Sequence, residues 1–485
     1  MVVSTLLRSR LAGANFVSHL VCFLLPFHYM EIRRYKDIIA VKMTPVKSPD
    51  TLGAGSAGIM AFHARNLEVA EISAEAFAEM KPINLNSSSA PDTAAFQNVE
   101  AGEQLKNWND ETEFHGRDGD LKFGIRSVTI NVTQICNLKC TYCAAGGDGT
   151  YGDPITKISI EKTLPQLKFF IDKLKDGQKF TISFVGGEPL LYPEAVQSIC
   201  QYVTDLKNTK NFQPIFSLIT NGTLITEKVA QLLKPYNLHV TISMDGEAKT
   251  NDVTRPTKNN QSSTELTLKG LHELRKIHDD LGSLGVSAVV NKDNMNILET
   301  YKYFQTLGFD WYEFNYDYSD KSETANDQYI QQMQELAAYA YNQGLNKNGN
   351  KQEAEIELRR IKSFDLYFKL LDDQQRIQNH CGAGKSYLMI DARNQLYTCP
   401  WVVGEKAEIV GRGEQLDHTA LAKYQKPLVE LNNCQSCWAR FLCGGGCMYI
   451  HREHTGDKHK KDYLFCKRIR GLILTTIMYY KISRE

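Results

Sequence analysis

The sequence predicts an α/β fold: a partial (β/α)6 TIM-like barrel flanked by a small α+β N-terminal module and by an irregular C-terminal domain. Between residues 121 and 320, short apolar segments rich in β-branched residues alternate with longer segments of helical periodicity. Alternation on this scale predicts a parallel sheet covered by helices, either open or curled into a partial barrel. After residue 375, long periodic segments are few and cysteines are frequent.

Six strands are expected in this central region, with helices between them. The strands are expected at residues 128–132, 180–185, 215–220, 238–244, 286–290 and 311–316. The helices are expected at residues 160–174, 194–206, 226–233, 265–280 and 297–306. Because chemistry in such folds lies at the carboxyl ends of the strands, the residues that follow each strand are candidates for an active site.

The first 45 residues are expected to be a disordered or mis-assigned extension, with Met30 or Met43 as the true start. An early apolar run looks like a signal peptide, but histidines interrupt it and no small-residue cleavage site follows. No segment has the roughly 20 clean apolar residues of a membrane span. We therefore expect neither export nor a membrane partner.

Residues 46–120 are expected to be a small strand–helix module followed by a linker. Residues 58–63 and 67–72 have the pattern of two strands, and Ser73 is a helix N-cap. Residues 86–120 are polar and rich in Ser, Asn, Asp and Gly, which predicts a linker.

Beyond the barrel, residues 321–375 are polar and helical, and are expected to connect two domains. Residues 376–470 are irregular, and a domain of this kind usually needs metal clusters or other cross-links to hold it together. Residues 471–485 are expected to form a terminal helix.

Composition excludes some partners. The net charge is zero, so no basic field exists to bind nucleic acid. The 12 cysteines are clustered within a large and otherwise ordinary chain. Such clustering favours metal ligation in a reducing cytosol over a disulfide scaffold, and so predicts a cytoplasmic protein.

The first motif is Cys136, Cys140 and Cys143, spaced C-x3-C-x2-C directly after the first expected strand. Three thiolates on one tight loop can hold three irons of a [4Fe–4S] cube and leave the fourth iron open. The alternatives are a zinc site that lacks its fourth ligand or a fortuitous spacing.

The second motif is Gly186-Gly187-Glu188-Pro189, directly after the second expected strand. The two glycines let backbone groups approach a ligand closely, and Glu188 can accept hydrogen bonds from an ammonium group. The alternative is a structural turn that carries an exposed acid and binds no ligand.

Together these motifs resemble the radical S-adenosylmethionine (SAM) superfamily. The resemblance implies that the three cysteines hold a cluster and that Gly186, Gly187 and Glu188 hold the SAM amino group. It also implies SAM contacts for Ser243, at the end of the fourth strand, and for Arg255. The alternative for that pair is a strand-end turn and a surface charge. By the same resemblance, Tyr142 lies near the adenine.

The third motif is C-x2-C-x5-C-x3-C from Cys434 to Cys447, followed by a last cysteine and preceded by two more. This pattern resembles the SPASM domain, which binds two auxiliary [4Fe–4S] clusters. The resemblance implies one fully ligated cluster on Cys434, Cys437, Cys443 and Cys466. It assigns the other cluster to Cys381, Cys399 and Cys447. Fully ligated relatives have a further cysteine about six residues before the first of these, but residues 373–376 contain none, so an open iron is expected here. A zinc ribbon would require four or eight ligands in paired C-x2-C knuckles, whereas this region has seven cysteines and one such pair.

Other residues are weaker candidates for a functional role. Cys200 is expected to be a buried core thiol, and His451, His454 and His459 are expected on a polar surface loop. Tyr312, Phe314 and Tyr316 alternate on the sixth strand, where they line a substrate cavity or pack in the core.

The resemblance implies an enzyme that cleaves SAM reductively and uses the 5′-deoxyadenosyl radical to modify a ribosomally made precursor peptide. The outcome is a crosslink, an epimerisation or a backbone excision or rearrangement. Relatives dock a leader peptide on a small N-terminal module or use a separate recognition protein, and a reductase or flavodoxin supplies electrons. One alternative is a sulfatase-maturing side-chain oxidase, against which Pro400 counts because such relatives carry a catalytic Asp after this cysteine. Others are a small-molecule radical SAM enzyme and a non-catalytic iron–sulfur electron-transfer protein.

Overall fold

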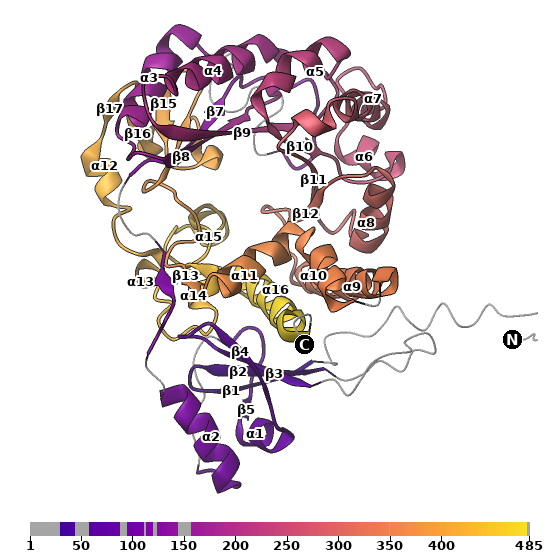
Figure 1. Cartoon of the computed structure of the whole chain (residues 1–485), viewed down its shortest axis with the longest axis vertical. Helices are drawn as coiled ribbons and strands as arrows, with labels where there is room; N and C mark the ends of the chain where they lie inside the picture. Colours follow the sequence, from indigo (N-terminus) through magenta and orange to yellow (C-terminus); the bar gives the residue numbers. More distant parts are fainter. Residues whose placement is uncertain are drawn as a thin grey trace, which may run out of the picture.

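The computed structural model describes residues 30–43, 58–87, 95–110, 113–119, 124–143, 157–348 and 350–482. A ring of strands and helices forms one end of the molecule, a helical layer lies beside it, and a small sheet with two helices lies at the far end (Figure 1). The extension expected before residue 30, with Cys22 in it, lies outside the described residues.

Six parallel strands form the wall of the ring, in the order β12-β11-β10-β9-β8-β7. They are β7 (Ser127–Asn131), β8 (Gln178–Val185), β9 (Phe212–Thr220), β10 (His239–Ser243), β11 (Ser283–Val290) and β12 (Trp311–Tyr316). Helices cover the outer side of the ring (Figure 1). They are α3 (Ile160–Asp172), α4 (Pro193–Leu206), α5 (Glu227–Leu233), α6 (Ala248–Thr254), α7 (Ser263–Arg275) and α8 (Ile297–Thr306). The ring is open at β12, so the expected partial barrel is confirmed.

Alternation along each strand separates an apolar outer face from a more polar inner face. On β8, Phe180, Ile182 and Phe184 are fully buried, whereas the residues between them are half-buried. On β12, Tyr312 packs edge-on against Tyr301 of α8, with ring centroids 4.8 Å apart. Of the two expectations for the aromatic face of β12, core packing is therefore correct for Tyr312.

The sheet continues into the cysteine-rich part of the chain. Strand β14 (Tyr387–Ile390) lies parallel beside β7, and β15 (Gln395–Tyr397), β16 (Ile409–Arg412) and β17 (Gln415–Leu416) follow it antiparallel. Asn394 makes the left-handed turn between β14 and β15 with φ of 61°. The C-terminal domain is thus more regular than the sequence predicted, and it extends the wall of the ring.

The expected connector is α9 (Glu323–Asn348), α10 (Lys351–Arg359) and α11 (Lys362–Asp372), which pack with the terminal helix α16 (Tyr463–Ile482). Short helices complete the cysteine-rich region: α12 (His418–Ala422), α13 (Leu428–Leu431), α14 (Arg440–Cys443) and α15 (Met448–Thr455). Helix α16 begins eight residues before the predicted boundary at 471, so Cys466 lies on it. Within the described part of the chain, no helix combines the length and apolarity that crossing a bilayer requires.

The N-terminal module is a five-stranded sheet in the order β4-β3-β2-β1-β5, with two helices. Its strands are β1 (Met30–Tyr35), β2 (Ile38–Met43), β3 (Ile59–His63), β4 (Glu68–Ile72) and β5 (Lys81–Pro82), and its helices are α1 (Ala74–Glu79) and α2 (Val99–Asp110). The expectation of an extension up to residue 45 is therefore wrong for residues 30–43, and a linker at 86–120 is wrong where α2 lies. Two-residue strands β6 (Arg117–Asp118) and β13 (Gln375–Arg376) then pair.

Both faces of this small sheet are covered. Phe77 of α1 and Leu105 of α2 pack on one face, and Met60 and Phe62 on the other face join the main core. Helix α16 contacts β3 and β4 on that second face. The module is therefore a part of the folded body, packed against the cysteine-rich region.

Candidate active site and cluster-binding pockets

The loop that carries the first three cysteines follows β7 and is joined to the segment after α6. The backbone amides of Lys139 and Thr141 donate to the carbonyls of Pro256 and Thr254 at 2.8 and 2.9 Å. Cys136 is buried, and Cys140 and Cys143 are partly exposed. Three thiols on one loop at the carboxyl end of the first strand suit a cluster with one open iron.

The Gly-Gly-Glu-Pro loop after β8 lies directly against the start of the cysteine loop. The amides of Gly187 and Glu188 donate to the carbonyls of Thr133 and Ile135 at 2.8 and 2.9 Å. A Cβ on Gly187 would lie 2.1 Å from the Ile135 oxygen, and one on Gly186, where φ is +149°, 2.4 Å from the Thr133 oxygen. The described contacts of these glycines are thus with the cysteine loop, whereas the sequence suggested close approach to a ligand.

Glu188 is buried at the centre of this end of the sheet. It accepts hydrogen bonds from Thr220 Oγ1 at 2.6 Å and from the backbone amides of Asn221 at 2.8 Å and Leu190 at 3.0 Å. Burial raises the pKa of the Glu188 carboxyl, and these hydrogen bonds act in the opposite direction. The alternative of an exposed acid in a turn is therefore wrong.

Asn221 connects this carboxylate to the cysteine loop. Its side-chain amide lies 3.8 Å from Cys136 Sγ and donates to Asn137 Oδ1 at 2.9 Å. Sequence reasoning missed Thr220 and Asn221. The available signal was their place at the end of the third expected strand, next to a glycine.

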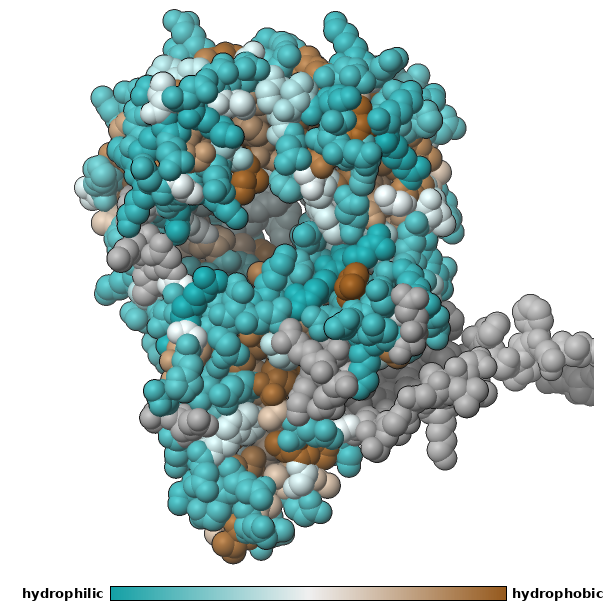
Figure 2. All heavy atoms as spheres, in the orientation of Figure 1, coloured by the Kyte–Doolittle hydropathy of each residue, from teal (hydrophilic) through white to brown (hydrophobic). Residues whose placement is uncertain are grey.

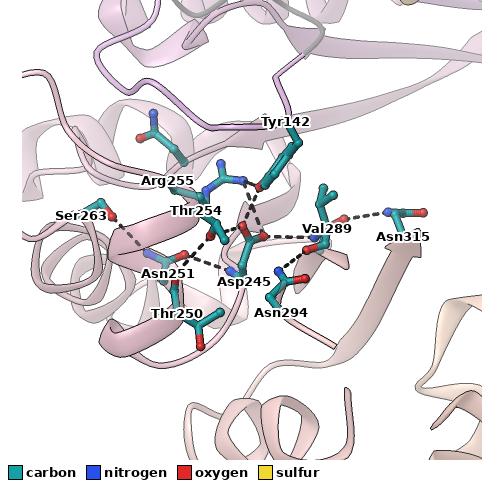
Figure 3. A network of polar contacts seen from close by, with 12 residues as sticks. Tyr142, Asp245, Thr250, Asn251, Thr254, Arg255, Ser263, Val289, Asn294 and Asn315 are labelled. Carbon is teal, nitrogen blue, oxygen red and sulfur yellow. Dashed lines mark hydrogen bonds and ion pairs between the residues drawn. The ribbon is translucent and has the colours of Figure 1, made fainter. Parts of the chain in front are cut away.

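Asp245 organises a second polar group, shown in Figure 3. Its carboxylate accepts from the Tyr142 hydroxyl and from Thr254 Oγ1, both at 2.7 Å, and from the Val289 amide at 3.0 Å. Arg255 donates to the Tyr142 hydroxyl and lies 3.8 Å from Asp245 Oδ1. Sequence reasoning gave no role to Asp245, which follows Ser243 by two residues at the end of the fourth expected strand.

This group places two of the predicted SAM contacts together. Arg255 is 8% exposed, so the alternative of a surface charge is wrong. Burial raises the pKa of Tyr142, which keeps its phenol protonated as the donor to Asp245. Ser243, the third predicted contact, is half-buried at the end of β10 on the inner face of the ring.

Four cysteines of the C-terminal region surround one pocket, together with buried cationic side chains. The pocket is lined by Cys434, Cys437, Cys443 and Cys466 and by Arg440, Lys461 and Arg470. Arg470 Nη2 lies 3.6 Å from Cys437 Sγ, and both arginines are less than 8% exposed. Buried cations need an anionic partner: Arg440 has one in Asp37, and four thiolates on an iron–sulfur cluster would supply one for Arg470.

The other three cysteines, Cys381, Cys399 and Cys447, line a second pocket with Tyr424, Arg452 and Lys458. The structure thus brings the seven C-terminal cysteines together as four and three, the division that the resemblance implied. Among the described residues, no three His, Cys, Asp or Glu side chains are grouped in the way that a single metal ion requires.

Two histidine expectations need correction, and one cysteine expectation holds. His451 lies on α15, is fully buried and accepts from the Asp462 amide at 3.2 Å; burial lowers its pKa to about 4. His454 lies on the same helix, with its side chain 5% exposed and 3.1 Å from Asp462. Neither residue is on a surface loop, because α15 packs inward. Cys200 is fully buried on α4, as expected.

Comparisons with known proteins find one matching family model and several relatives. Residues 130–304 match the model of the radical SAM superfamily. The radical SAM cyclopropyl synthase TigE of Paramaledivibacter caminithermalis is 22% identical over 373 residues, covering 72% of this chain and 73% of the relative. The cysteine-type anaerobic sulfatase-maturating enzyme of Clostridium novyi is 26% identical over 357 residues, covering 69% of this chain and 91% of the relative.

A solved structure shares the fold. Native anSMEcpe with bound AdoMet and Cp18Cys peptide superposes with a TM-score of 0.59 at 20% identity, covering 74% of this chain and 98% of that chain. The likeness supports the open ring of parallel strands and its extension into the C-terminal region.

Proposed function

We propose that this chain, which is a radical SAM enzyme related to SPASM-type maturases, modifies a ribosomally made precursor peptide. The observation that carries the proposal is the convergence of three groups at the carboxyl ends of the strands: the cysteine loop after β7, Glu188 after β8, and the Tyr142–Asp245–Arg255 group after β10. When bound, a [4Fe–4S] cluster and SAM supply a 5′-deoxyadenosyl radical that abstracts hydrogen from a substrate C–H bond.

The chain's own residues would bind the cluster and SAM and orient them. Cys136, Cys140 and Cys143 would hold the cluster, and Glu188 would accept hydrogen bonds from the SAM amino group. Glu188 is already held by Thr220 and Asn221, so its carboxylate is fixed before SAM arrives. Tyr142, Arg255 and Ser243 would contact the rest of SAM, with Asp245 positioning the first two.

Two auxiliary clusters complete the proposal, for a total of three. Cys434, Cys437, Cys443 and Cys466 would ligate one cluster fully, and the buried arginines beside them suit its negative charge. Cys381, Cys399 and Cys447 would hold the other with one iron open to substrate or to another side chain.

A peptide substrate is supported by a relative and by the N-terminal module. The solved relative contains a bound peptide. In the described residues, β4 is the outermost strand on one side of the module sheet, where an extended leader peptide could add through main-chain hydrogen bonds. A separate recognition protein could deliver the peptide instead, and a reductase or flavodoxin in a reducing cytosol would supply electrons.

Oxidation of a protein side chain is the second candidate, favoured by the Clostridium novyi relative named above. Against it, Cys399 is followed by Pro400, which begins a short 3-10 turn and has no acid–base group. Peptide maturation is therefore preferred.

The test is anaerobic reconstitution, followed by an iron count and incubation with SAM, a reductant and the peptide encoded beside the gene. About twelve irons per chain, 5′-deoxyadenosine and a change in peptide mass are expected, since each cubane holds four irons. The triple variant Cys136→Ala, Cys140→Ala, Cys143→Ala is the control, and it should retain about eight irons. Wild-type protein that forms no 5′-deoxyadenosine would refute a radical SAM activity. A peptide of unchanged mass, with no deuterium uptake from heavy water, would refute modification of that peptide.

A further inference from the structure

The inner face of β12 carries a carboxylate that the proposed chemistry does not use. Tyr312 and Phe314 point outward, where they pack against Tyr301 and Phe304 of α8. Side chains alternate along a strand, so Trp311, Glu313 and Asn315 point into the ring. The centre of the ring is hollowed in the space-filling view (Figure 2).

Glu313 stands in one row with the predicted SAM contact Ser243. Ser243 of β10 is the register partner of Ser287 on β11, and Ser287 is the register partner of Glu313. Register partners in a parallel sheet point to the same face, and neighbouring strands are about 4.8 Å apart. The Glu313 backbone is therefore about 10 Å from that of Ser243, at the same height on the inner wall.

A chain of two neutral side chains holds the carboxylate without neutralising it. Ser287 Oγ donates to Glu313 Oε2 at 2.9 Å, and Asn315 Nδ2 donates to Ser287 Oγ at 3.0 Å. Asn315 extends from the end of β12 toward β11 (Figure 3). Within the described part of the chain, no Lys, Arg or His pairs with Glu313, and its second oxygen accepts no hydrogen bond. A half-buried anion held in this way is ready to bind a cation.

Aromatic side chains gather beyond the carboxyl end of the same strand. Tyr318, which follows β12, packs against Trp401 and Tyr449 with ring centroids 5.3 Å away in each case, and Trp401 is 40% exposed. Aromatic faces accommodate aliphatic stems and attract cations. The carboxylate on the wall suits a side chain with a positive head, and the aromatic rings beyond the end of the strand suit the aliphatic parts of the same peptide.

We propose that Glu313 is a specificity residue that receives a lysine or arginine side chain of the substrate peptide, close to the residue that is modified. The proposal rests on the proposed function, because it requires a peptide inside the ring. Ser287 and Asn315 are positioning residues: Asn315 orients Ser287, and Ser287 holds one carboxylate oxygen and leaves the other for the incoming cation.

The test measures peptide binding to the reconstituted holoenzyme in the presence of SAM, by equilibrium dialysis. The probes are pentapeptides, acetyl-Gly-Gly-X-Gly-Gly-amide, in which X is lysine, arginine, norleucine or glutamine. The lysine and arginine peptides are expected to bind about tenfold more tightly than the norleucine peptide, a difference of about 1.4 kcal/mol. Glu313→Gln keeps the size and the Ser287 hydrogen bond, and should abolish the preference. Glu299→Gln, on the exposed face of α8, is the matched control and should retain it.

Either of two binding results would overturn the proposal: equal binding of the lysine and norleucine peptides by the wild-type holoenzyme, or a preference that survives Glu313→Gln. If the preference survives and Glu313→Gln loses SAM affinity instead, Glu313 is a counter-ion of the SAM sulfonium. SAM affinity and 5′-deoxyadenosine formation are measured without peptide, so a failure of the radical SAM activity is distinguished from a failure of the Glu313 assignment.

Discussion

Single residues determine how the two loops of the candidate SAM site fit together. Gly187 is the clearest case, because a methyl group there would meet the Ile135 carbonyl and the Cys136 amide. These atoms belong to the backbone and cannot rotate aside. The glycine pair therefore sets the position of the cysteine loop as well as that of Glu188.

Gly187→Ala is expected to separate the two loops and to cost about 1–3 kcal/mol of stability, as overpacking does. Reconstituted protein should lose about four irons, since the first cluster would lack its cysteine geometry. Iron content and chemical denaturation measure these effects. Gly124→Ala, where a Cβ would meet nothing within 4 Å, is the control and should resemble the wild type. Full iron content and unchanged stability in Gly187→Ala would contradict the close approach.

Asp245→Asn should weaken SAM binding and destabilise the protein by about 3 kcal/mol, because Arg255 would remain buried without its carboxylate. The amide would also lose part of its capacity to accept from Tyr142, Thr254 and the Val289 amide. SAM affinity from equilibrium dialysis and urea unfolding are the measurements. Asp279→Asn, a fully exposed carboxylate, serves as the matched variant. SAM affinity equal to that of the wild type would remove Asp245 from the site.

The sequence predicts the motif residues of the site well, and the residues that join the motifs by hydrogen bonds poorly. Cysteines and the Gly-Gly-Glu-Pro run carry fixed spacings, which are readable because cluster ligation restricts both residue type and separation. Asp245, Thr220 and Asn221 act through hydrogen bonds that join the ends of five strands, β7 to β11, and no spacing along the chain encodes those contacts. Glu313 was missed because the sequence left open which face of β12 is apolar.

At the scale of elements, the strands of the ring were predictable and the start of the chain was not. In ring strands such as β8 and β12 every second residue is buried, so the period of two is clear. Strand β1 contains two consecutive arginines, Arg33 and Arg34, which interrupt the alternation of apolar residues. Arg34 is nevertheless only 2% exposed. Burial of Arg34 depends on partners far along the chain, and local sequence does not reveal them.

Strand β3 of the N-terminal module contains a buried histidine that makes the module sensitive to acid. His63 is fully buried, with its ring centroid 5.7 Å from that of Trp108 on α2. Burial lowers the pKa of His63 from 6.5. The folded module therefore keeps His63 neutral while the unfolded chain takes up a proton, and the stability is present above about pH 6.5 and is lost as the pH falls below it.

Hydrogen exchange in β3 and α2, corrected for intrinsic rates, should be faster at pH 5.5 than at pH 7.5. His63→Gln, which still accepts from the Asn66 amide, should show a smaller pH dependence. His418→Gln on the distant helix α12 is the control and should retain it. An equal pH dependence in His63→Gln and the wild type would show that another group causes the acid sensitivity.

At the scale of the whole molecule, three arginines join the N-terminal module to the pocket of four cysteines. Arg34 donates to the Ser436 carbonyl at 2.9 Å, and Arg440 pairs with Asp37 at 3.1 Å. Arg470 donates to the Leu85 carbonyl at 2.7 Å while its other nitrogen lies beside Cys437 Sγ. Burial lowers the pKa of Arg34 and the other two arginines lower it further, whereas Asp37 and Cys437 raise it; three cations thus face one carboxylate, and the group benefits from an anion in the pocket.

If that anion is a cluster, removing it should loosen a part of the chain about 400 residues earlier in sequence. In the reconstituted holoenzyme, Cys437→Ser should increase hydrogen exchange in β1, β2 and residues 81–87, because the arginines would repel one another and release their contacts with the module. Cys381→Ser is the matched control: it removes a ligand of the other pocket, none of whose lining residues belongs to the module, and should leave exchange in the module unchanged. Equal protection of the module in both variants and in the wild type would mean that the arginine contacts hold without the cluster. Faster exchange in Cys437→Ser alone would mean that cluster assembly at the C-terminal end fixes the proposed leader-docking module in place.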